Sequence, residues 1–287
     1  MTTINLPSAP EFLCIGFFCH DLHEGDYILG GTASYASLMA SQLGKRTAVM
    51  TSVGNDFEYF EVFKNNNIEV FNKPANKTTV FNNIYENGNR IQFIYDPAEK
   101  LFLNDLPNQW RQSSIVKFCL IADEVDFSLL NAFPNSLVGA TIQGWLRQWD
   151  ETGKISPKKI NWELLKPVDI IFFSDADIEN LETTLPEIIK TVKTVVMTKG
   201  ANGVSIFQQN NTFEFPSFPI NEVDPTGAGD IFATAFLLHF YQTKNIALSA
   251  AFAHAAASLV VEEIGPKIPT KAQIEERYDE YKRRFIN

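Results

Sequence analysis

Short apolar runs alternate with helical patterns along most of the chain, and this alternation limits the folds that the sequence allows. Five runs rich in β-branched and aromatic residues, bounded by turn residues, have the length of buried strands; they are residues 11–18, 115–122, 137–143, 169–174 and 194–200. Helical patterns lie between them, such as residues 34–44 and 185–192. This order favours a three-layer, doubly wound α/β fold, in which helices cover both faces of a mostly parallel sheet.

At 287 residues the chain suits one large α/β domain or two small ones. No internal repeat or low-complexity linker divides it, so we treat residues 1–287 as a single domain. Residues 80–96 alternate polar and apolar side chains around Asn87-Gly88, which is a strong hairpin signal. Residues 203–216 indicate a second hairpin that turns near Asn210-Asn211. The first hairpin lies between helical units, and we expect it to project as a flap.

The last quarter of the chain, after Pro225, is strongly helical, with patterns over residues 227–242, 246–265 and 271–285. Its most apolar stretch, residues 247–261, is short for a membrane span and contains His254. A buried helix is therefore the better interpretation, and we expect no membrane partner. The basic residues 282–284 are typical of the solvated carboxyl end of a helix, where cations interact favourably with the helix dipole.

Charge and cysteine content argue against several classes of function. The chain has 24 Lys and Arg against 34 Asp and Glu, a formal net charge of −10. This charge disfavours a nucleic-acid partner, because binding a phosphate backbone relies on basic side chains. Cys14, Cys19 and Cys119 are an odd, loosely spaced set, which suits a reducing compartment better than a disulfide framework. The first ten residues lack the features of a signal peptide, so we expect a cytoplasmic protein.

Three familiar kinds of site find little support in the sequence. Cys14, Cys19, His20 and His23 invite a zinc interpretation, but the paired spacings of zinc ligands are missing and Cys14 lies within an apolar run. No G-x-G-x-x-G follows the first strand, which disfavours a Rossmann dehydrogenase. No G-x-x-x-x-G-K-[ST] occurs, which excludes a P-loop nucleotide site.

The segment Gly227-Ala228-Gly229-Asp230 directly precedes an apolar helical pattern. A helix amino terminus presents unpaired backbone N–H groups and the positive end of the dipole, and glycines let an anion approach them closely. The three small residues therefore suit a phosphoryl group. Asp230 is either a helix cap or a base that takes a proton from an attacking hydroxyl, and the spacing alone leaves both interpretations open.

Residues 224–236 resemble the carboxy-terminal signature of the ribokinase-like (PfkB) carbohydrate kinases, D-T-x-G-A-G-D followed by a helix. Asp224, Thr226 and residues 227–230 match it, and Pro225 replaces the usual Thr. Residues 29–44 are similar to the other family signature, a Gly-Gly pair that opens a helix ending in Leu-Gly. The resemblance covers nearly the whole chain and implies the ribokinase-like fold, with a small β lid near residues 22–32 and 78–96.

The resemblance also assigns roles to single residues. It implies that Asp230 is the catalytic base and that the amides of Gly227, Ala228 and Gly229 bind the transferring phosphoryl group. Candidate substrate-binding residues are Asp21, Gly31 and Arg147. The family's nucleotide loop, T-x-G-x-x-G, is matched by Thr198, Gly200 and Gly203, with Lys199 inside it, and His254 falls where family members contact the nucleotide. For Lys199 an exposed turn residue, and for His254 a tolerated core residue, stay open as interpretations.

Two segments depart from the usual family pattern. Arg147 falls where many members have D-P-N-x-R, but residues 143–145 are Gln, Gly and Trp, a variant that resembles the myo-inositol kinase-like members. A surface pair between Arg147 and Asp150 is the alternative. The N-x-x-E motif, which helps to organise magnesium, is replaced by Ser174 and Asp177. Asp177 supplies a carboxylate for the metal, whereas Ser174 is a poor substitute for Asn.

The resemblance implies an ATP-dependent, Mg²⁺-requiring kinase of a small hydroxylated substrate, a sugar or a cyclitol. A nucleoside acceptor is the first alternative, since Phe17, Phe18 and Tyr85 could stack on a base. A non-catalytic nucleotide or metabolite sensor is the second. Members of the family often pair their flaps across a dimer, so a homodimer through the lid stays open. Whether the enzyme requires a monovalent cation also stays open.

Overall fold

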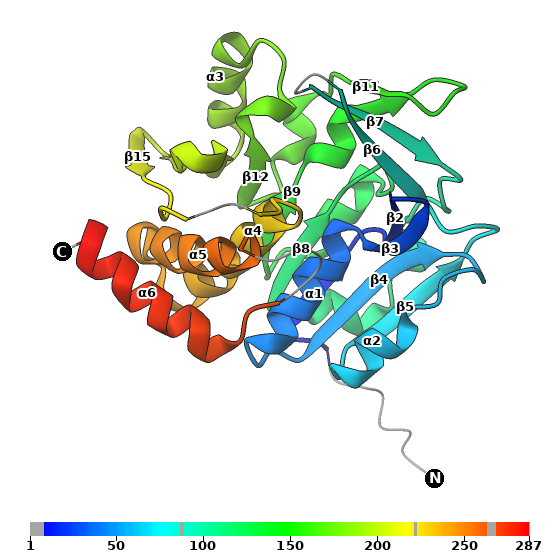
Figure 1. Cartoon of the computed structure of the whole chain (residues 1–287), viewed down its shortest axis with the longest axis horizontal. Coiled ribbons are helices and arrows are strands. Elements are labelled where there is room, and N and C mark those ends of the chain that lie inside the picture. The colour runs from blue at the N-terminus through cyan, green and yellow to red at the C-terminus, as the bar shows by residue number, and fades with distance from the viewer. Residues whose placement is uncertain (1–8, 87–88, 221–222, 263–267, 287) are drawn as a thin grey trace.

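The computed structural model describes residues 9–86, 89–220, 223–262 and 268–286. A nine-stranded sheet runs through its centre in the order β15-β14-β13-β12-β9-β8-β1-β4-β5 (Figure 1). The strands from β5 to β13 are parallel, and β14 and β15 add an antiparallel edge. Their bounds are β1 (Phe12–Ile15), β4 (Thr47–Val53), β5 (Glu69–Pro74), β8 (Ile115–Cys119), β9 (Leu137–Thr141), β12 (Ile170–Ser174), β13 (Thr194–Thr198), β14 (Val204–Gln208) and β15 (Asn211–Phe215).

Helices cover both faces of this sheet, which confirms the three-layer, doubly wound α/β fold. One core cluster packs under α1 (Thr32–Gln42), α2 (Phe60–Asn65), α4 (Ala228–Thr243) and α5 (Ile246–Val260), and α6 (Lys271–Phe285) packs on the outside of α5. The other cluster packs under α3 (Leu181–Thr191) and several short 3₁₀ segments. The central strands are buried on both faces, so they have no polar alternation; every residue of β1 is fully buried.

A second, smaller sheet lies over one end of the large one and forms the lid sheet (Figure 1). Its order is β3-β2-β6-β7, with bounds β2 (Cys19–His23), β3 (Asp26–Gly30), β6 (Val80–Glu86) and β7 (Asn89–Tyr95). The predicted first hairpin is β6 and β7; its centre, Asn87-Gly88, lies outside the described residues. The small β lid expected beside the large sheet is therefore present.

Three details differ from the sequence predictions. Strands β4 and β5 were missed, although all seven residues of β4 are buried. The second hairpin turns at Gln209-Asn210, because Asn211 already pairs with Gln208 as the first residue of β15. Helix α5 ends at Val260, short of the predicted end, and residues 263–267 lie outside the described part. Within the described ranges, no helix is both long and apolar enough to cross a membrane.

Candidate active site

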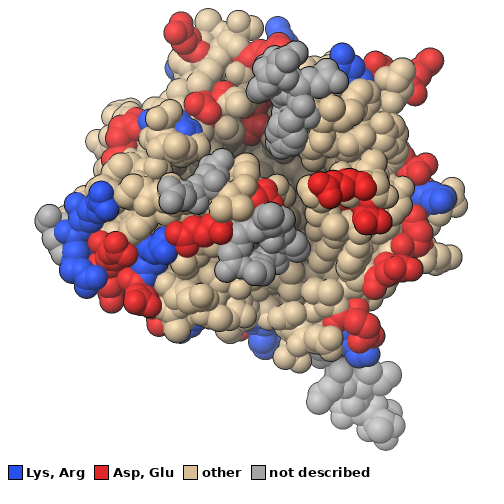
Figure 2. Space-filling model, viewed as in Figure 1, with Lys and Arg blue, Asp and Glu red and all other residues tan. Residues whose placement is uncertain are grey.

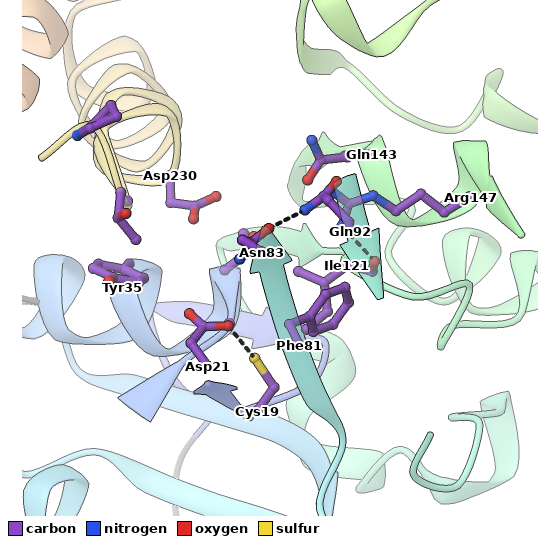
Figure 3. Close-up of a pocket in the computed structure, with 15 residues that line it drawn as sticks. Cys19, Asp21, Tyr35, Phe81, Asn83, Gln92, Ile121, Gln143, Arg147 and Asp230 are labelled. Atoms are coloured by element: carbon purple, nitrogen blue, oxygen red, sulfur yellow. Dashed lines mark hydrogen bonds between the residues drawn. The ribbon is translucent and has the colours of Figure 1, made fainter. Parts of the chain in front are cut away.

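A cavity of about 220 Å³ lies between the lid sheet and the amino end of α4 (Figure 3). Five of the predicted site residues line it, namely Asp21, Gly31, Arg147, Gly227 and Asp230. The remaining lining residues are Cys19, Thr32, Tyr35, Phe81, Asn83, Gln92, Ile121, Gln143, Pro225 and Thr226. Segments more than 200 residues apart in the sequence therefore form one polar site.

The amino terminus of α4 supplies the anion-binding part of this site. Gly227 is the N-cap, with φ of 79°, and a Cβ there would lie 2.4 Å from Cε1 of Tyr35, so only glycine fits. The Ala228 amide donates to the Pro225 carbonyl at 3.2 Å, so it is already used within the turn. In the described part of the chain, the amides of Gly229 and Asp230 have no acceptor. The amide of Gly227 also has no acceptor among the described residues, so these three N–H groups are available to an anion.

Asp230 is half-buried in the first turn of α4 and lines the cavity. Burial raises the pKa of its carboxyl group, while Lys117, the Thr32 hydroxyl and Arg147 act in the opposite direction. A carboxylate at a helix start beside a cavity has the location that a general base requires. Its raised pKa also strengthens it as a proton acceptor.

Lys117 was not recognised in the sequence as a functional candidate. It lies in β8, is fully buried, and its Nζ is 3.6 Å from Sγ of Cys119. It is the cation that most lowers the pKa of Asp230. The sequence could have indicated Lys117, because it is a lone lysine inside a strand buried on both faces. Burying a charge there is unfavourable in free energy unless a nearby anion compensates it.

Asp21 lies in β2 on the opposite side of the cavity and is half-buried. Its Oδ1 accepts a hydrogen bond from Sγ of Cys19 at 3.7 Å. Burial raises the pKa of Asp21 to about 6, and the negative charge of Asp230 adds to this effect. The Gly30-Gly31 pair provides the space: a Cβ on Gly30 would lie 2.2 Å from Oδ2 of Asp21, and a Cβ on Gly31, at φ 94°, would lie 2.6 Å from the Phe17 carbonyl.

Arg147 is a buried residue of the site, so the alternative of an exposed surface pair with Asp150 is wrong. Only 8% of Arg147 is exposed, and it belongs to the short strand β10 (Arg147–Trp149), which pairs with β11 (Ile155–Pro157). Its Nη1 donates to the Ile121 carbonyl at 2.9 Å and its Nη2 to Oε1 of Gln92 at 2.8 Å. The guanidinium group also lies over the Phe81 ring, 5.6 Å from its centroid.

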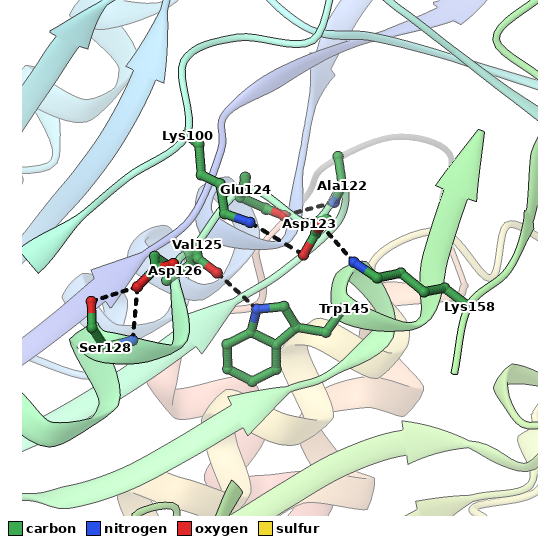
Figure 4. A network of polar contacts seen from close by, with 9 residues as sticks. All are labelled: Lys100, Ala122, Asp123, Glu124, Val125, Asp126, Ser128, Trp145 and Lys158. Carbon is green, nitrogen blue, oxygen red and sulfur yellow. Dashed lines mark hydrogen bonds and ion pairs between the residues drawn. The ribbon is translucent and has the colours of Figure 1, made fainter. Parts of the chain in front are cut away.

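Buried Glu124 holds the loop that carries the Ile121 carbonyl, and Figure 4 shows its contact with Ala122. Its carboxylate accepts from the amides of Ile121 at 2.8 Å and Ala122 at 2.7 Å. Burial raises the pKa of Glu124, and these amide hydrogen bonds oppose the rise. The same loop is fixed by Nε1 of Trp145, which donates to the Val125 carbonyl at 2.9 Å. Glu124 thus positions Arg147 through the Ile121 carbonyl, a role that no sequence motif indicated.

The predicted metal residue, Asp177, lies at the edge of the site. Its Oδ2 accepts from the Ser174 amide at 2.8 Å and its Oδ1 from Nε2 of Gln143 at 2.6 Å. Within the described residues there is no group of three or more His, Cys, Asp and Glu side chains that could hold a metal ion, zinc included. Magnesium commonly binds one or two protein carboxylates together with phosphates and water. The carboxylate of Asp177 could be the protein ligand of a magnesium ion bound in this way.

The predicted nucleotide loop does not line the cavity: Thr198 ends β13, and Lys199, Gly200 and Gly203 lie in the turn that leads to β14. Gly200 and Gly203 have φ of 52° and 87°, and a Cβ on Gly203 would lie 2.1 Å from the Phe215 carbonyl. Oγ1 of Thr198 is 3.4 Å from the Phe173 carbonyl. Nζ of Lys199 forms an ion pair with Glu214 at 2.6 Å. Contact of this turn with a nucleotide stays a prediction.

His254 lies in the core between α4 and α6. Its ring stacks on Tyr281 with centroids 5.4 Å apart and meets the edge of Phe232 at 5.0 Å. Burial lowers the pKa of His254 to about 4, so the ring is neutral near pH 7. Its proposed contact with a nucleotide is not tested by these packing contacts.

Acidic side chains lie beside a hollow on the face shown in Figure 2, whereas the basic residues of the last turn of α6 gather at one edge. The cavity itself combines the carboxylates of Asp21 and Asp230 with buried Arg147 and the amino terminus of α4. Carboxylates and amides suit hydroxyl groups, and the helix terminus suits a phosphoryl group. The arrangement defines a phosphotransferase that acts on an alcohol group.

Comparisons with known proteins agree with this class. The family model of the pfkB family carbohydrate kinases matches residues 20–273. The nucleoside kinase of Methanothermobacter thermautotrophicus is 26% identical over 267 residues, which cover 87% of this chain and 84% of that protein. Inositol 3-kinase of Arabidopsis thaliana is 23% identical over 291 residues, covering 95% and 80%. A pyrophosphate-dependent kinase of the ribokinase family superposes with a TM-score of 0.79 at 22% identity, over 93% of this chain and 99% of that one.

The chain therefore belongs to the pfkB family of carbohydrate kinases. It has the ribokinase-like fold and is a sugar or nucleoside kinase that transfers a phosphoryl group to a hydroxyl acceptor. The membership expected from the two sequence signatures is confirmed.

Proposed function

We propose that the protein transfers the γ-phosphoryl group of ATP to a hydroxyl group of a small polyhydroxylated compound, a sugar or a cyclitol. The observation that carries this proposal is the single cavity that contains Asp21, Asp230 and the amino terminus of α4. A carboxylate accepts hydrogen bonds from two adjacent hydroxyl groups, so Asp21 suits a polyol. Asp230 lies beside the free amides of α4, where the transferring group would be held.

The reaction uses these groups in one displacement. Asp230 takes the proton of the acceptor hydroxyl as its oxygen bonds to the γ-phosphorus and the bond from phosphorus to the bridging oxygen of ADP breaks. The amides of Gly229 and Asp230 stabilise the negative charge on the transferring oxygens. Magnesium, where bound, neutralises phosphate charge, and Asp177 is the residue that would hold it. The lid sheet excludes water, which limits wasteful hydrolysis of ATP.

The size of the cavity favours a single-ring acceptor over a nucleoside. A volume of about 220 Å³ is below the range of roughly 300–1,000 Å³ that is typical of drug-sized ligands. Phe17 and Phe18, which could have stacked on a base, are 1% and 0% exposed and belong to the core. The similarity to a nucleoside kinase keeps a nucleoside as the second candidate.

A panel assay tests the proposal. Release of ADP from Mg-ATP is followed with myo-inositol, D-ribose, D-fructose, cytidine and adenosine as acceptors. In a parallel series pyrophosphate replaces ATP, and release of inorganic phosphate is followed. Turnover of a sugar or cyclitol with ATP is the expected result. Turnover of nucleosides alone would establish the alternative acceptor. Nucleotide binding without turnover of any acceptor would contradict the proposal and support a non-catalytic sensor.

We also propose that two copies pair through their lid sheets. The outer face of the lid sheet is apolar, with Tyr27 55%, Tyr95 39% and Ile84 37% exposed. Burying such a patch is favourable in proportion to its apolar area. Sedimentation should show a dimer that Tyr27→Glu converts to a monomer; a monomeric wild-type protein would contradict this assembly.

The three cysteines support a cytoplasmic location. Cys14, Cys19 and Cys119 are free, buried thiols. Free thiols persist in a reducing compartment. Fractionation of cells that produce the protein at its natural level tests this assignment, and recovery outside the cytoplasm would contradict it.

A further inference from the structure

A second hollow, of about 680 Å³, lies between α3 and the segment of residues 157–163, and we call it the α3 groove. It is larger than the acceptor cavity, and its volume is within the range of roughly 300–1,000 Å³ that is typical of ligand sites. Helix α3 lines one wall with Thr183, Thr184, Glu187, Lys190 and Thr191, and residues 157–163 line the other. Leu146 and residues 177–180 complete the lining.

The apolar part of the groove is formed by Ile160, Trp162 and Ile178, which line it and pack, partly buried, against the core. Trp162 is half-buried, so part of its ring is accessible from the groove. An aromatic ring of this size offers a large apolar surface. The groove can therefore receive the apolar face of a ring-shaped ligand.

The charges around the groove nearly cancel, since three lysines and four acids line it. Two of these charges have partners of their own: Nζ of Lys158 is 2.7 Å from Oδ2 of Asp123, as Figure 4 shows, and Glu163 forms an ion pair with Lys166. A groove of mixed sign does not attract a strongly charged molecule of either kind. Its charge balance therefore favours a neutral ligand.

The α3 wall mainly offers hydrogen-bond acceptors. The hydroxyl of Thr183 donates to the Asn180 carbonyl at 2.9 Å, and that of Thr191 donates to the Glu187 carbonyl at 3.0 Å. A hydroxyl group has a single proton, so both oxygens are left only as acceptors. The carboxylate of Glu187 can likewise only accept when it is ionised. Lys190 adds a donor near the end of this wall.

The opposite wall offers donors. Oδ1 of Asn161 accepts from the Glu163 amide at 3.1 Å, and this bond fixes the orientation of the side chain because a backbone amide can only donate. The NH₂ group of Asn161 is then free to donate, and among the described residues it has no acceptor. The ammonium group of exposed Lys159 is a further donor on this wall.

We propose that the α3 groove is a second binding site, for a neutral polyhydroxylated compound such as a sugar or a cyclitol. Each hydroxyl of such a compound can donate to one wall and accept from the other, and its ring can lie on Trp162. An anion would leave the acceptors of Thr183 and Thr191 unanswered, because it has no proton to donate.

The groove and the acceptor cavity share a wall. Asp177 lines the groove, and its Oδ1 accepts from Nε2 of Gln143 at 2.6 Å, while Gln143 lines the cavity. A ligand in the groove can therefore act on the acceptor through these two side chains. This coupling rests on the proposed function, whereas binding in the groove does not.

Titrations with myo-inositol, D-ribose and D-fructose test the site. Each compound is added up to about 10 mM, and both tryptophan emission and heat are followed, so that a Kd of about 1 mM is measurable. At least one of the three should change the emission of the wild-type protein. This change should be absent in Trp162→Phe, which keeps an apolar ring in the groove.

A double variant tests the hydrogen bonds. Thr183→Val combined with Thr191→Val keeps the shape of both side chains but removes two acceptors, so Kd should rise about 10-fold or more. Thr212→Val is the matched control, because Thr212 is exposed on β15 and lines neither the groove nor the cavity; it should bind like the wild-type protein. D-ribose 5-phosphate should bind at least about 10-fold more weakly than D-ribose, because its phosphate has no matching partner.

Three results would overturn the site. They are no emission change that depends on Trp162 with any of the three compounds, an unchanged Kd in the double variant, and tighter binding of D-ribose 5-phosphate than of D-ribose. The last result would identify an anion site instead.

Kinetics test the coupling. A compound of the three that binds in the groove and is not phosphorylated should change KM for the best acceptor of the five-compound panel by about twofold or more, and the double variant should lose this effect. Competition inside the acceptor cavity would persist in the double variant and would overturn the coupling. If the wild-type enzyme phosphorylates none of the five compounds, the proposed function fails, and the titrations still decide whether the groove is a binding site.

Discussion

The proposed acceptor side and the proposed donor side of this site are built differently. The acceptor side takes its residues mainly from the lid sheet, β10 with the segment before it, and the amino ends of α1 and α4. Hydrogen bonds fix Gln92, Gln143 and Arg147 in place. The predicted donor side is a turn between β13 and β14 whose lysine, Lys199, is paired with exposed Glu214. Exposed ion pairs contribute little, about 0–1 kcal/mol, so Lys199 can leave Glu214 at small cost.

This difference indicates where selectivity arises. A cavity with fixed donors and acceptors rejects a molecule whose hydroxyl groups point elsewhere, because its own polar groups are then left unpaired. A glycine-rich turn contacts phosphates mainly through its backbone, which tolerates side-chain changes. Substitutions on the acceptor side should therefore have large effects, and those on the donor side small ones.

The largest effect is expected from Asp230→Asn. The asparagine keeps the shape but cannot take the proton, so kcat should fall by roughly 10²-fold or more. Steady-state assays measure kcat, and calorimetry should show ATP affinity near that of the wild-type enzyme. Asp175→Asn, an exposed acid at the edge of the site, is the control and should keep its turnover. Unchanged kcat in Asp230→Asn would leave Asp230 as a helix residue without a catalytic role.

Asp21→Asn should lower kcat/KM by about 10- to 100-fold, because one of the two acceptor oxygens becomes a donor. In the wild-type enzyme, kcat/KM should fall as pH drops through about 6, where Asp21 becomes protonated. The variant should lose this step in the pH profile. A step that persists in Asp21→Asn belongs to another group.

The raised pKa of Asp21 also predicts a cost in stability. The folded state holds this proton more tightly than the unfolded chain, whose pKa is near 3.8, so stability falls as pH rises from about 4 to about 6. Above that range Asp21→Asn should melt at a higher temperature than the wild-type protein, and near its lower end the difference should shrink. Thermal melts at pH 4.5 and pH 8 measure this; equal shifts at both values would disagree with it.

Lys117→Met should lower kcat about 10-fold near neutral pH and move the acidic limb of the kcat profile to higher pH. Removing the cation takes away the largest of the effects that lower the pKa of Asp230, so a larger fraction of the base is protonated at a given pH. Removing one of two opposite buried charges leaves the other without compensation and is destabilising, so the melting temperature should fall as well. A limb that does not move would show that Lys117 does not act on Asp230.

The smallest effects are expected on the donor side. Lys199→Ala should raise KM for ATP about threefold, and Glu214→Gln should leave it unchanged or slightly lower, since Lys199 is then released from its ion pair. Initial rates at varied ATP measure both. A change of KM above about 30-fold in Lys199→Ala would show that the donor side is as sensitive to substitution as the acceptor side.

The sequence predicted the parts of the site that lie in contiguous motifs. Residues 227–230 combine a helix start, glycines and an acid within four positions. A helix amino terminus with small residues can bind an anion, so the sequence alone indicates what this segment does. The alternation of buried runs likewise predicted the parallel sheet, although β4 and β5 escaped notice.

The residues that the sequence did not reveal act through contacts between distant segments. Gln92 matters because Arg147, 55 positions later, donates to it. Glu124 matters because its carboxylate caps the loop that holds Arg147. A single Gln or Glu in a polar stretch carries no signal of such a partner. Only the fold, which places the lid sheet beside β10, reveals the connection.

The central claim is that Asp230 takes the proton of an acceptor bound in the cavity. A crystal structure of the complex with the best acceptor and a non-hydrolysable ATP analogue tests it directly. We expect one acceptor hydroxyl within about 2.6–3.2 Å of the Asp230 carboxylate, in line with the γ-phosphorus. An acceptor bound elsewhere, with no hydroxyl within reach of Asp230, would contradict the claim.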